Sequence, residues 1–382
     1  MSKTGYKRLG DYIREVDVRN RDLEVKELVG LTINKAFIPS VANTIGTDLS
    51  SYKVIRKEQF ACSLMQVSRD GKMPVAMFEG ECAIMSPAYP MFEVVDKTVL
   101  LPQYLMMWFS RNEFDREASF YAVGGVRGSL TWQDFCDMTL PIPPIEQQRK
   151  IVAEYETISK RIRLNEQMIT RLEETAQTLY RKMFVDGIDK ENLPEGWSMG
   201  TIGEFCKDMV SGGTPSRTHS EYWDSKDYRW LKTGEVQNNI VLNTEEYISA
   251  EGLKNSSAKI VPSGTVVMAM YGATAGQIAY LECDTTTNQA CCNMICYTKE
   301  DAAFLFFHLL YYQYEIKRLA NGGAQENLNQ EIIAAQPICI FDDDKIKSIF
   351  VKLVDLIISK YKEHSLLTNL QSLLLAKMGH YN

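Results

Sequence analysis

Histidine is scarce in this chain, and the residue patterns of several enzyme classes are missing. The 382 residues include four histidines, and their scattered positions form neither a catalytic triad nor a metal cluster by spacing. No G-x-x-x-x-G-K-[ST] phosphate loop occurs, which argues against ATP hydrolysis by this chain. The Asn/Asp-Pro-Pro-aromatic tetrapeptide of DNA amino-methyltransferases and a convincing adenosylmethionine loop are also missing. The sequence therefore predicts no catalytic residues and no bound metal or cofactor.

The cysteines do not follow a disulfide or zinc pattern. There are nine of them, an odd number in a large chain, which argues against a disulfide framework. The tightest group, Cys283, Cys291, Cys292 and Cys296, contains no C-x-x-C pair and is interpreted as small buried strand residues. An enzyme with a thiol site around Cys291 and Cys292 is an alternative that would require a histidine nearby.

Long apolar runs are also missing. No run approaches 18 uncharged apolar residues, so no membrane span is expected. Residues 1–11 carry three basic residues without an apolar core, so no secretory signal is expected. With 45% hydrophobic and 24% charged residues, the chain is expected to be a folded cytoplasmic protein of two or three domains.

An internal repeat organises the chain. Four matches occur in the same order in both halves, at offsets between 193 and 198 residues. They are Leu9-Gly10 with Ile202-Gly203, Gly124-Gly125 and Leu130 with Gly322-Gly323 and Leu328, Leu140-Pro141 with Gln336-Pro337, and Lys182-Met183 with Lys377-Met378. The sequence therefore predicts a globular–helix–globular–helix order, with boundaries at 1–143, 144–190, 191–336 and 337–382.

The globular parts combine β-rich runs with one buried helix each. The expected strands are Tyr52–Arg56, Val75–Phe78, Cys82–Met85, Thr265–Met270, Gln277–Leu281 and Asn293–Tyr297, and the expected helices are Tyr104–Phe109 and Phe304–Leu310. The predicted fold class is α+β, with two strand-rich α/β domains separated by two long helices and related by a pseudo-two-fold repeat.

The two long helical segments carry a heptad seam. Apolar residues recur at alternating spacings of four and three, which is typical of a coiled coil. The seam is predicted to contain Ile151, Ile158, Ile162, Asn165, Ile169, Leu172, Leu179, Leu353, Leu356, Glu363, Leu367, Leu370 and Leu374. We expect antiparallel pairing with Asn165 opposite Glu363, in a rod of roughly 50 Å.

Several motifs resemble one known family. Leu140-Pro-Ile-Pro-Pro-Ile-Glu-Gln-Gln-Arg149 runs into the first heptads, and Leu193-Pro-Glu-Gly-Trp197 opens the second half. Ser211-Gly-Gly-Thr-Pro-Ser216 and Asn288-Gln289 follow. Along essentially the whole chain, the sequence resembles the specificity (S) subunit of Type I restriction-modification systems. Phe60–Met65 and Gly125–Arg127 depart from the family pattern.

The resemblance implies a non-catalytic reader of DNA. Each target-recognition domain would read one half of a bipartite, gapped site in the major groove, and the coiled coil would fix the gap. The coiled coil would also dock two methyltransferase (M) subunits, and restriction (R) subunits would join that complex. S-adenosylmethionine, ATP and Mg would be bound by those partners, and no membrane is involved.

Charge gives weak support for DNA binding. The net charge is −7, and residues 191–335 hold 18 acidic and 10 basic residues, whereas a DNA-binding protein is expected to be basic. Cations gathered on one face, or phosphate contacts supplied by the M subunits, would reconcile the two. Polar and basic residues in turn-like segments are the predicted DNA contacts. They are Lys35, Arg69, Lys72, Arg127, Thr214, Arg217, Lys232, Tyr271 and Thr274.

The negative charge also supports a different function. A non-catalytic adaptor, with two peptide- or protein-binding domains on a coiled-coil spacer, would have no DNA sequence preference and no methyltransferase partner. A test of DNA specificity separates the two hypotheses.

Overall fold

The chain divides into two compact units. The computed structural model describes residues 5–40, 46–65, 67–123, 129–186, 188–189, 191–319 and 327–380. Unit 1 comprises Met1–Ile162 with Leu367–Asn382, and unit 2 comprises Arg163–Leu366. Two long helices, α5 (Ile145–Phe184) and α10 (Asp344–Lys377), contribute residues to both units.

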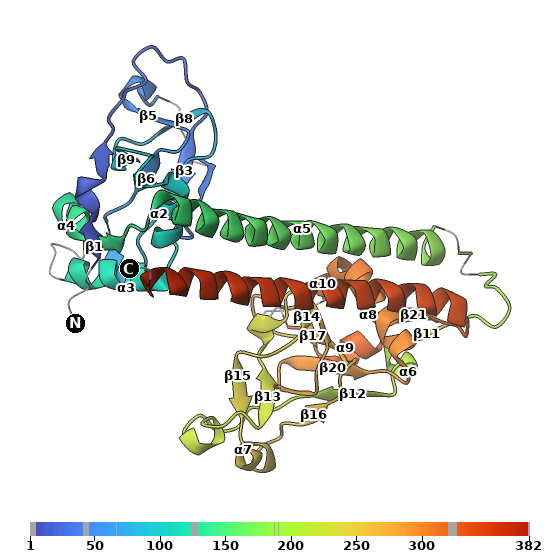
Figure 1. The fold of residues 1–382 in the computed structure, drawn as a ribbon. Coiled ribbons are helices and arrows are strands. Elements are labelled where there is room, and N and C mark those ends of the chain that lie inside the picture. The colour runs from blue at the N-terminus through green and yellow to red at the C-terminus, as the bar shows by residue number, and fades with distance from the viewer. Residues whose placement is uncertain are drawn as a thin grey trace. The chain divides into compact units, whose positions relative to one another are not determined.

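Unit 1 contains a mixed set of short strands and helices (Figure 1). Its strands are β1 (Tyr6–Arg8), β2 (Ile13–Glu15), β3 (Val29–Leu31), β4 (Phe37–Pro39), β5 (Lys53–Arg56), β6 (Phe60–Cys62), β7 (Val75–Met77), β8 (Cys82–Met85), β9 (Met91–Val94) and β10 (Thr139–Pro141). Its shorter helices are α1 (Val67–Asp70), α2 (Pro102–Phe109), α3 (Asn112–Val123) and α4 (Trp132–Asp137). The main sheet has the order β2-β9-β6-β7, beside the pairs β1-β10, β3-β4 and β5-β8.

Unit 2 has larger sheets. Its strands are β11 (Ser198–Thr201), β12 (Asp208–Ser211), β13 (Tyr228–Leu231), β14 (Asn239–Val241), β15 (Glu246–Ile248), β16 (Ile260–Val261), β17 (Val266–Ala269), β18 (Ile278–Leu281), β19 (Thr285–Thr287), β20 (Cys291–Ile295) and β21 (Pro337–Ile340). Its shorter helices are α6 (Ile202–Phe205), α7 (Ala250–Lys254), α8 (Lys299–Arg318) and α9 (Gln330–Ala334). The sheets have the orders β12-β20-β17-β18-β14 and β15-β13-β19-β16, beside the pair β11-β21.

The predicted repeat is present in the hydrogen bonding. In unit 1, β1 pairs antiparallel with β10, and the Leu9 amide donates to the Met138 carbonyl at 2.8 Å. In unit 2, β11 pairs antiparallel with β21, and the Ile202 amide donates to the Gln336 carbonyl at 2.9 Å. In each unit, the residue after this donor is a glycine at which a Cβ would press against α4 or α9. The α+β fold with an internal repeat is confirmed.

Each unit has its own aromatic core. In unit 1, the Phe60 and Phe92 rings stack with centroids 5.0 Å apart, and Phe109 meets both edge-on. In unit 2, Phe184 at the end of α5 lies 4.8 Å from Phe304 of α8 and 6.1 Å from Phe350 of α10. The predicted buried helices, within α2 and α8, supply Phe109 and Phe304. Burial of such side chains is the main favourable term in folding, so each unit can hold its own segments of α5 and α10.

Within each unit, α5 and α10 run side by side in opposite directions (Figure 1), as the heptads predict. In unit 1, the Gln371 side-chain nitrogen donates to the Ser159 hydroxyl at 2.8 Å. A pairing that kept Asn165 opposite Glu363 would instead place Ser159 opposite Asn369. In unit 1, Ser159 therefore bonds to a residue two positions from the one that the predicted register places opposite it.

The predicted polar layer is wrong in its details. Asn165 is fully buried, but neither its side-chain oxygen nor its nitrogen has a hydrogen-bond partner among the described residues. Glu363 accepts instead from Lys360 of its own helix at 2.7 Å.

Two other predicted seam residues lie largely at the surface. Leu356 is 50% exposed and Leu370 is 46% exposed, whereas Ile357 is 1% exposed. The first half of α10 is apolar on most sides because in unit 2 it contacts both α5 and the globular core. Its apolar spacing therefore fits more than one seam, and the sequence alone does not select the correct one.

The remaining local predictions hold with one exception. Each of the six expected strands overlaps an observed one, namely β5, β7, β8, β17, β18 or β20. Arg69, placed in a turn-like segment by the sequence, lies instead in α1, and the turn follows at Gly71, whose φ is +64°. No helix among the described residues has a stretch long and apolar enough to cross a membrane.

Candidate nucleic-acid interface

The predicted contact residues of unit 2 lie on loops that hydrogen-bond to one another. These residues are Thr214, Arg217, Lys232, Tyr271 and Thr274. The Gly213 amide donates to the Thr287 carbonyl at 2.8 Å, and the Asn288 amide donates to the Leu231 carbonyl at 3.0 Å. The Thr274 hydroxyl donates to the Thr233 carbonyl at 2.9 Å. Four loops, after β12, β13, β17 and β19, are thereby brought to one edge of unit 2.

The loop after β12 depends on two adjacent glycines. A Cβ at Gly212 would collide with the backbone oxygens of Thr287 and Asn288, and a Cβ at Gly213 would collide with the backbone of Ser257 and Ala258. Both glycines thus permit close packing of the main chain. The loop that carries Thr214 and Arg217 starts from this fixed point.

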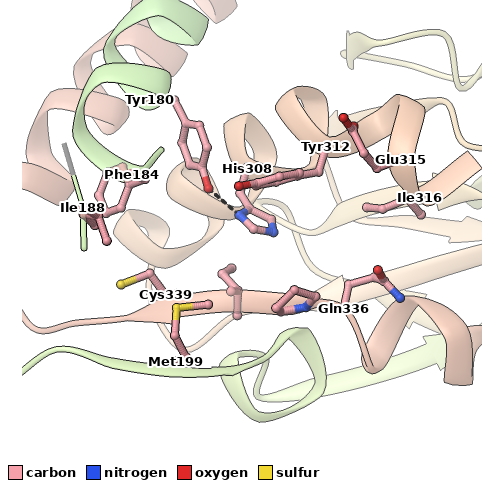
Figure 2. A pocket seen from close by; sticks show the side chains of 12 residues that line it. Tyr180, Phe184, Ile188, Met199, His308, Tyr312, Glu315, Ile316, Gln336 and Cys339 are labelled. Carbon is pink, nitrogen blue, oxygen red and sulfur yellow. Dashed lines mark hydrogen bonds between the residues drawn. The ribbon is translucent and has the colours of Figure 1, made fainter. Parts of the chain in front are cut away.

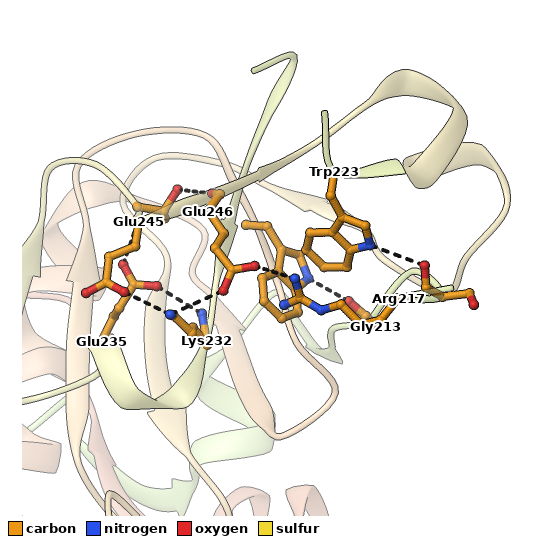
Figure 3. A network of polar contacts seen from close by, with 10 residues as sticks. Gly213, Arg217, Trp223, Lys232, Glu235, Glu245 and Glu246 are labelled. Atoms are coloured by element: carbon orange, nitrogen blue, oxygen red, sulfur yellow. Dashed lines mark hydrogen bonds and ion pairs between the residues drawn. The ribbon is translucent and has the colours of Figure 1, made fainter. Parts of the chain in front are cut away.

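Arg217 is held between aromatic rings and a carboxylate (Figure 3). Its guanidinium carbon lies 3.4 Å from the ring centroid of Trp223 and 5.0 Å from that of Trp230. Its Nη1 donates to Glu246 at 2.5 Å, and the side chain remains 52% exposed. Trp230 is buried and donates its indole N–H to the Gly213 carbonyl at 2.9 Å. Arg217 is therefore oriented by its stacking and its ion pair while part of it stays accessible.

Carboxylates surround the second cation of this edge. Lys232 contacts Glu245 at 2.8 Å and Glu246 at 3.2 Å, and these bonds raise the pKa of its ammonium (Figure 3). The hydrogen bond from Arg217 lowers the pKa of Glu246, whereas burial raises the pKa of Glu235. Two of the acidic residues of this domain, Glu245 and Glu246, thus hold its own cations in place.

Sequence reasoning missed Gln289 as a site residue. Its side-chain oxygen accepts the hydrogen bond of the Thr214 hydroxyl, and its amide N–H groups have no partner among the described residues. Gln289 is exposed. The Asn288-Gln289 pair directly after a strand was the available signal, because an exposed amide next to a fixed loop offers donors to a ligand.

Unit 1 offers a smaller set of exposed cations. Arg69 lies on α1, is 66% exposed in its side chain and pairs with the neighbouring Asp70 at 2.6 Å. Lys72 is exposed in the turn that follows. Arg127 lies outside the described residues, so its position is not discussed. Arg69 and Lys72 are four residues and one residue from an anchored position, Met73.

Lys35 is not a surface contact, contrary to prediction. Its ammonium donates to the Phe109 carbonyl and pairs with Asp115 at 2.8 Å, with side-chain exposures of 9% and 10%. Asp115 also accepts from the Met73 amide at 3.1 Å. The Lys35 side chain is therefore buried. It neutralises the Asp115 carboxylate, which anchors the turn that carries Lys72. Asp115 lies 80 residues from Lys35 in the sequence, so the residues around Lys35 did not indicate that its side chain is buried.

The cysteines do not form a reactive site. All nine are free, and no group of three or more potential metal ligands occurs among the described residues. Burial raises the pKa of the Cys291 and Cys292 thiols to about 12 each. A nucleophilic cysteine needs a lowered pKa, so the thiol-enzyme alternative has no support in this region.

Comparison with known proteins identifies a domain in the second half of the chain. Residues 194–364 match the family model described as the Type I restriction modification DNA specificity domain. This part of the chain is a Type I DNA specificity domain. It includes all five predicted contact residues of unit 2 and the four loops that carry them.

The relatives of the whole chain are specificity subunits. The chain is 23% identical over 360 residues to the Type I restriction enzyme HindI specificity subunit of Haemophilus influenzae, which covers 73% of this chain and 77% of that protein. It is 26% identical over 103 residues to the EcoR124I/EcoR124II specificity subunit of Escherichia coli, covering 26% and 24%. The crystal structure of the Type I S subunit from M. genitalium matches 98% of this chain and 95% of its own, with a TM-score of 0.61 at 14% identity. The resemblance stated from the sequence is confirmed, and the fold is that of an S subunit.

Unit 2 also contains a cavity whose lining residues lie outside the four loops. It has a volume of about 230 Å³ and is lined by α5, α8, β11 and β21 (Figure 2). Inside it, the Tyr180 hydroxyl and His308 Nδ1 are 2.6 Å apart. Burial lowers the pKa of His308 to about 3, so its imidazole is neutral at pH 7.

The buried imidazole predicts acid sensitivity. In the unfolded chain the pKa of a histidine is 6.5, whereas in the folded chain the pKa of His308 is about 3. Between these two pH values the unfolded state binds a proton at His308 and the folded state does not, so acid favours unfolding. Relative to His308→Gln, which does not titrate, the wild-type chain should lose about 2 kcal/mol of unfolding free energy between pH 7 and pH 5. Urea unfolding at both pH values measures this difference. Parallel losses in the two proteins would show that His308 is charged when folded.

Proposed function

We propose that this chain is the DNA sequence-specificity subunit of a Type I restriction-modification enzyme, and that each of its two globular parts reads one half of a bipartite, gapped DNA site. The four-loop edge of the specificity domain carries this proposal. Arg217, Lys232 and Gln289 offer hydrogen-bond donors there, and base edges in the major groove are recognised by such donors rather than by net charge. In unit 1, Arg69 and Lys72 take the corresponding role, and Lys35 is left out.

The repeat supports a division of labour along the chain. We assign residues 1–143 and 191–336 to target recognition and residues 144–190 and 337–382 to the helical parts. Helices α5 and α10 have 40 and 34 residues, or about 60 and 51 Å at 1.5 Å per residue. Two half-sites on one face of B-DNA lie roughly 34–36 Å apart, so helices of this length suffice to set the spacer.

The helices also supply a docking surface for methyltransferase subunits. In unit 1, α5 and α10 enclose a groove of about 540 Å³ lined by Ile158, Leu370 and Leu374 among others. Leu370 is 46% and Leu373 is 67% exposed, which leaves apolar surface uncovered. We assign this groove to one of two M subunits, through which R subunits would join. Catalysis, S-adenosylmethionine, ATP and Mg would belong to those cytoplasmic partners.

Genomic methylation provides the test. Deleting this chain while the neighbouring M subunit stays intact should abolish methylation at one bipartite, gapped motif, and the unchanged chain supplied in trans should restore it. Replacing residues 191–335 by those of a related subunit should then change only one half of the motif. An unchanged methylation pattern, with the chain deleted and the M subunit present, would contradict the proposal and favour a protein-binding adaptor.

A further inference from the structure

The two repeats differ at one place in their first strand, which is half-buried at Tyr6 and 41% exposed at Met199. Strand pairing defines equivalent positions, because Tyr6 lies opposite Pro141 in the β1-β10 pair and Met199 lies opposite Cys339 in the β11-β21 pair. The side chain at this place is therefore a phenol ring in unit 1 and a flexible thioether in unit 2.

In unit 1 this place is filled by large side chains. The Tyr6 ring meets Trp108 of α2 edge-on at 5.9 Å, and its hydroxyl donates to the Gly379 carbonyl at 2.9 Å. The Arg111 guanidinium covers the other part of Trp108, 4.1 Å from its ring centroid. An aromatic ring, an indole and a guanidinium thus occupy the space between β1, α2 and the end of α10.

In unit 2 the equivalent place is the 230 Å³ cavity. Met199 takes the position of Tyr6, and His308 of α8 lines the same cavity. The change from tyrosine to methionine removes a ring. Cavities of about 150 Å³ with apolar walls hold a benzene molecule, so this one has room for a single substituted ring.

The cavity also presents an unused polar atom. The Tyr180 hydroxyl is buried and has only His308 as a hydrogen-bond partner, so donation from Tyr180 to Nδ1 leaves the proton of the neutral imidazole on Nε2. Nε2 has no partner among the described residues, although His308 is only 2% exposed, and it points toward β21 in Figure 2. The Nε2–H is thereby available to a hydrogen-bond acceptor that enters the cavity.

We propose that this cavity binds a small monocyclic phenol. The ring would occupy the space that the Tyr6 ring fills in unit 1, between Met199, Ile316 and Phe184. Its hydroxyl oxygen would accept the His308 Nε2–H. The exposed Glu315 at the lining marks the side open to solvent, through which the ligand would enter. This site is separate from DNA reading and does not depend on the proposed function.

Phenol itself is the probe, used with the full-length chain. We expect a dissociation constant on the order of 1 mM, so 5 mM phenol should raise the folding equilibrium constant about sixfold. Labelled methionine methyl groups report the place of binding, and the Met199 methyl signal should shift while that of Met209 stays. Met199→Tyr, which restores the side chain of unit 1, should abolish binding, and the matched control Met199→Leu should keep it.

Several results would overturn the proposal. Failure of 10 mM phenol to shift the Met199 signal would remove the site altogether, even if Met199→Tyr proved unstable. Undiminished phenol binding to a folded Met199→Tyr chain would place the ligand elsewhere. Toluene binding as tightly as phenol would remove the role of His308 and with it the assigned ligand class. None of these results bears on the methylation test.

Discussion

Replacing Lys35 by methionine is expected to lower the unfolding free energy of unit 1 by about 3–5 kcal/mol. The change leaves the Asp115 carboxylate buried without its counter-charge, and an uncompensated buried charge is among the most destabilising single changes. Burial already lowers the pKa of the Lys35 ammonium, with Asp115 opposing that shift. Hydrogen exchange of the β2, β6, β7 and β9 amides in the full chain measures unit 1 separately from unit 2.

Two matched variants make this result specific. Adding Asp115→Asn to Lys35→Met should restore most of the loss, because the neutral amide oxygen can still accept from the Met73 amide. Lys57→Met removes an exposed cation whose contact with Glu81 is 3.7 Å, and it should change stability by less than about 1 kcal/mol. Equal losses in Lys35→Met and Lys57→Met would show that the ion pair is not buried in solution.

Lys35 shows where reasoning from the sequence stops. The α+β fold, the repeat and both long helices could be predicted because they rest on patterns within one segment or on matches between two segments. Whether a lysine faces solvent depends on what the chain places against it, and Asp115 reaches Lys35 only through the folding of α3 onto the turn after α1. The same limit explains Leu356, since an all-round apolar helix conceals which of its faces is covered.

The four-loop edge was predictable only in part. Residue type and turn-like context suggested Thr214, Arg217, Lys232, Tyr271 and Thr274, and the structure brings their loops together. The restraint on Arg217 could not be foreseen, because Trp223, Trp230 and Glu246 come from three other segments. The cavity beside His308 could not be predicted either, because it depends on the space that the Met199 side chain leaves unfilled in the folded chain.

The Gly212→Ala variant is expected to disable the second half of DNA recognition. The new Cβ would lie well inside 3.0 Å of the Thr287 and Asn288 carbonyl oxygens, and both belong to main chain that cannot move alone. Overpacking of this kind destabilises by about 1–3 kcal/mol, and relief requires the loop after β12 to shift away from β19. Such a shift carries Thr214 and Arg217 with it, and we expect DNA affinity of the assembled M–S complex to fall at least tenfold.

Gly234→Ala is the matched control for this variant. Gly234 lies in the neighbouring loop after β13, and a Cβ there would meet nothing within 4 Å. The control should leave stability within about 0.5 kcal/mol and methylation unchanged, because an alanine that fits mainly restricts the unfolded chain. Binding to duplexes mutated in one half-site or the other separates the effects. Gly212→Ala should lose discrimination at the half-site that we assign to residues 191–336 and keep it at the other. Loss of discrimination at both half-sites would mean that the change acts through general unfolding, and full discrimination at both would mean that these loops do not contact DNA.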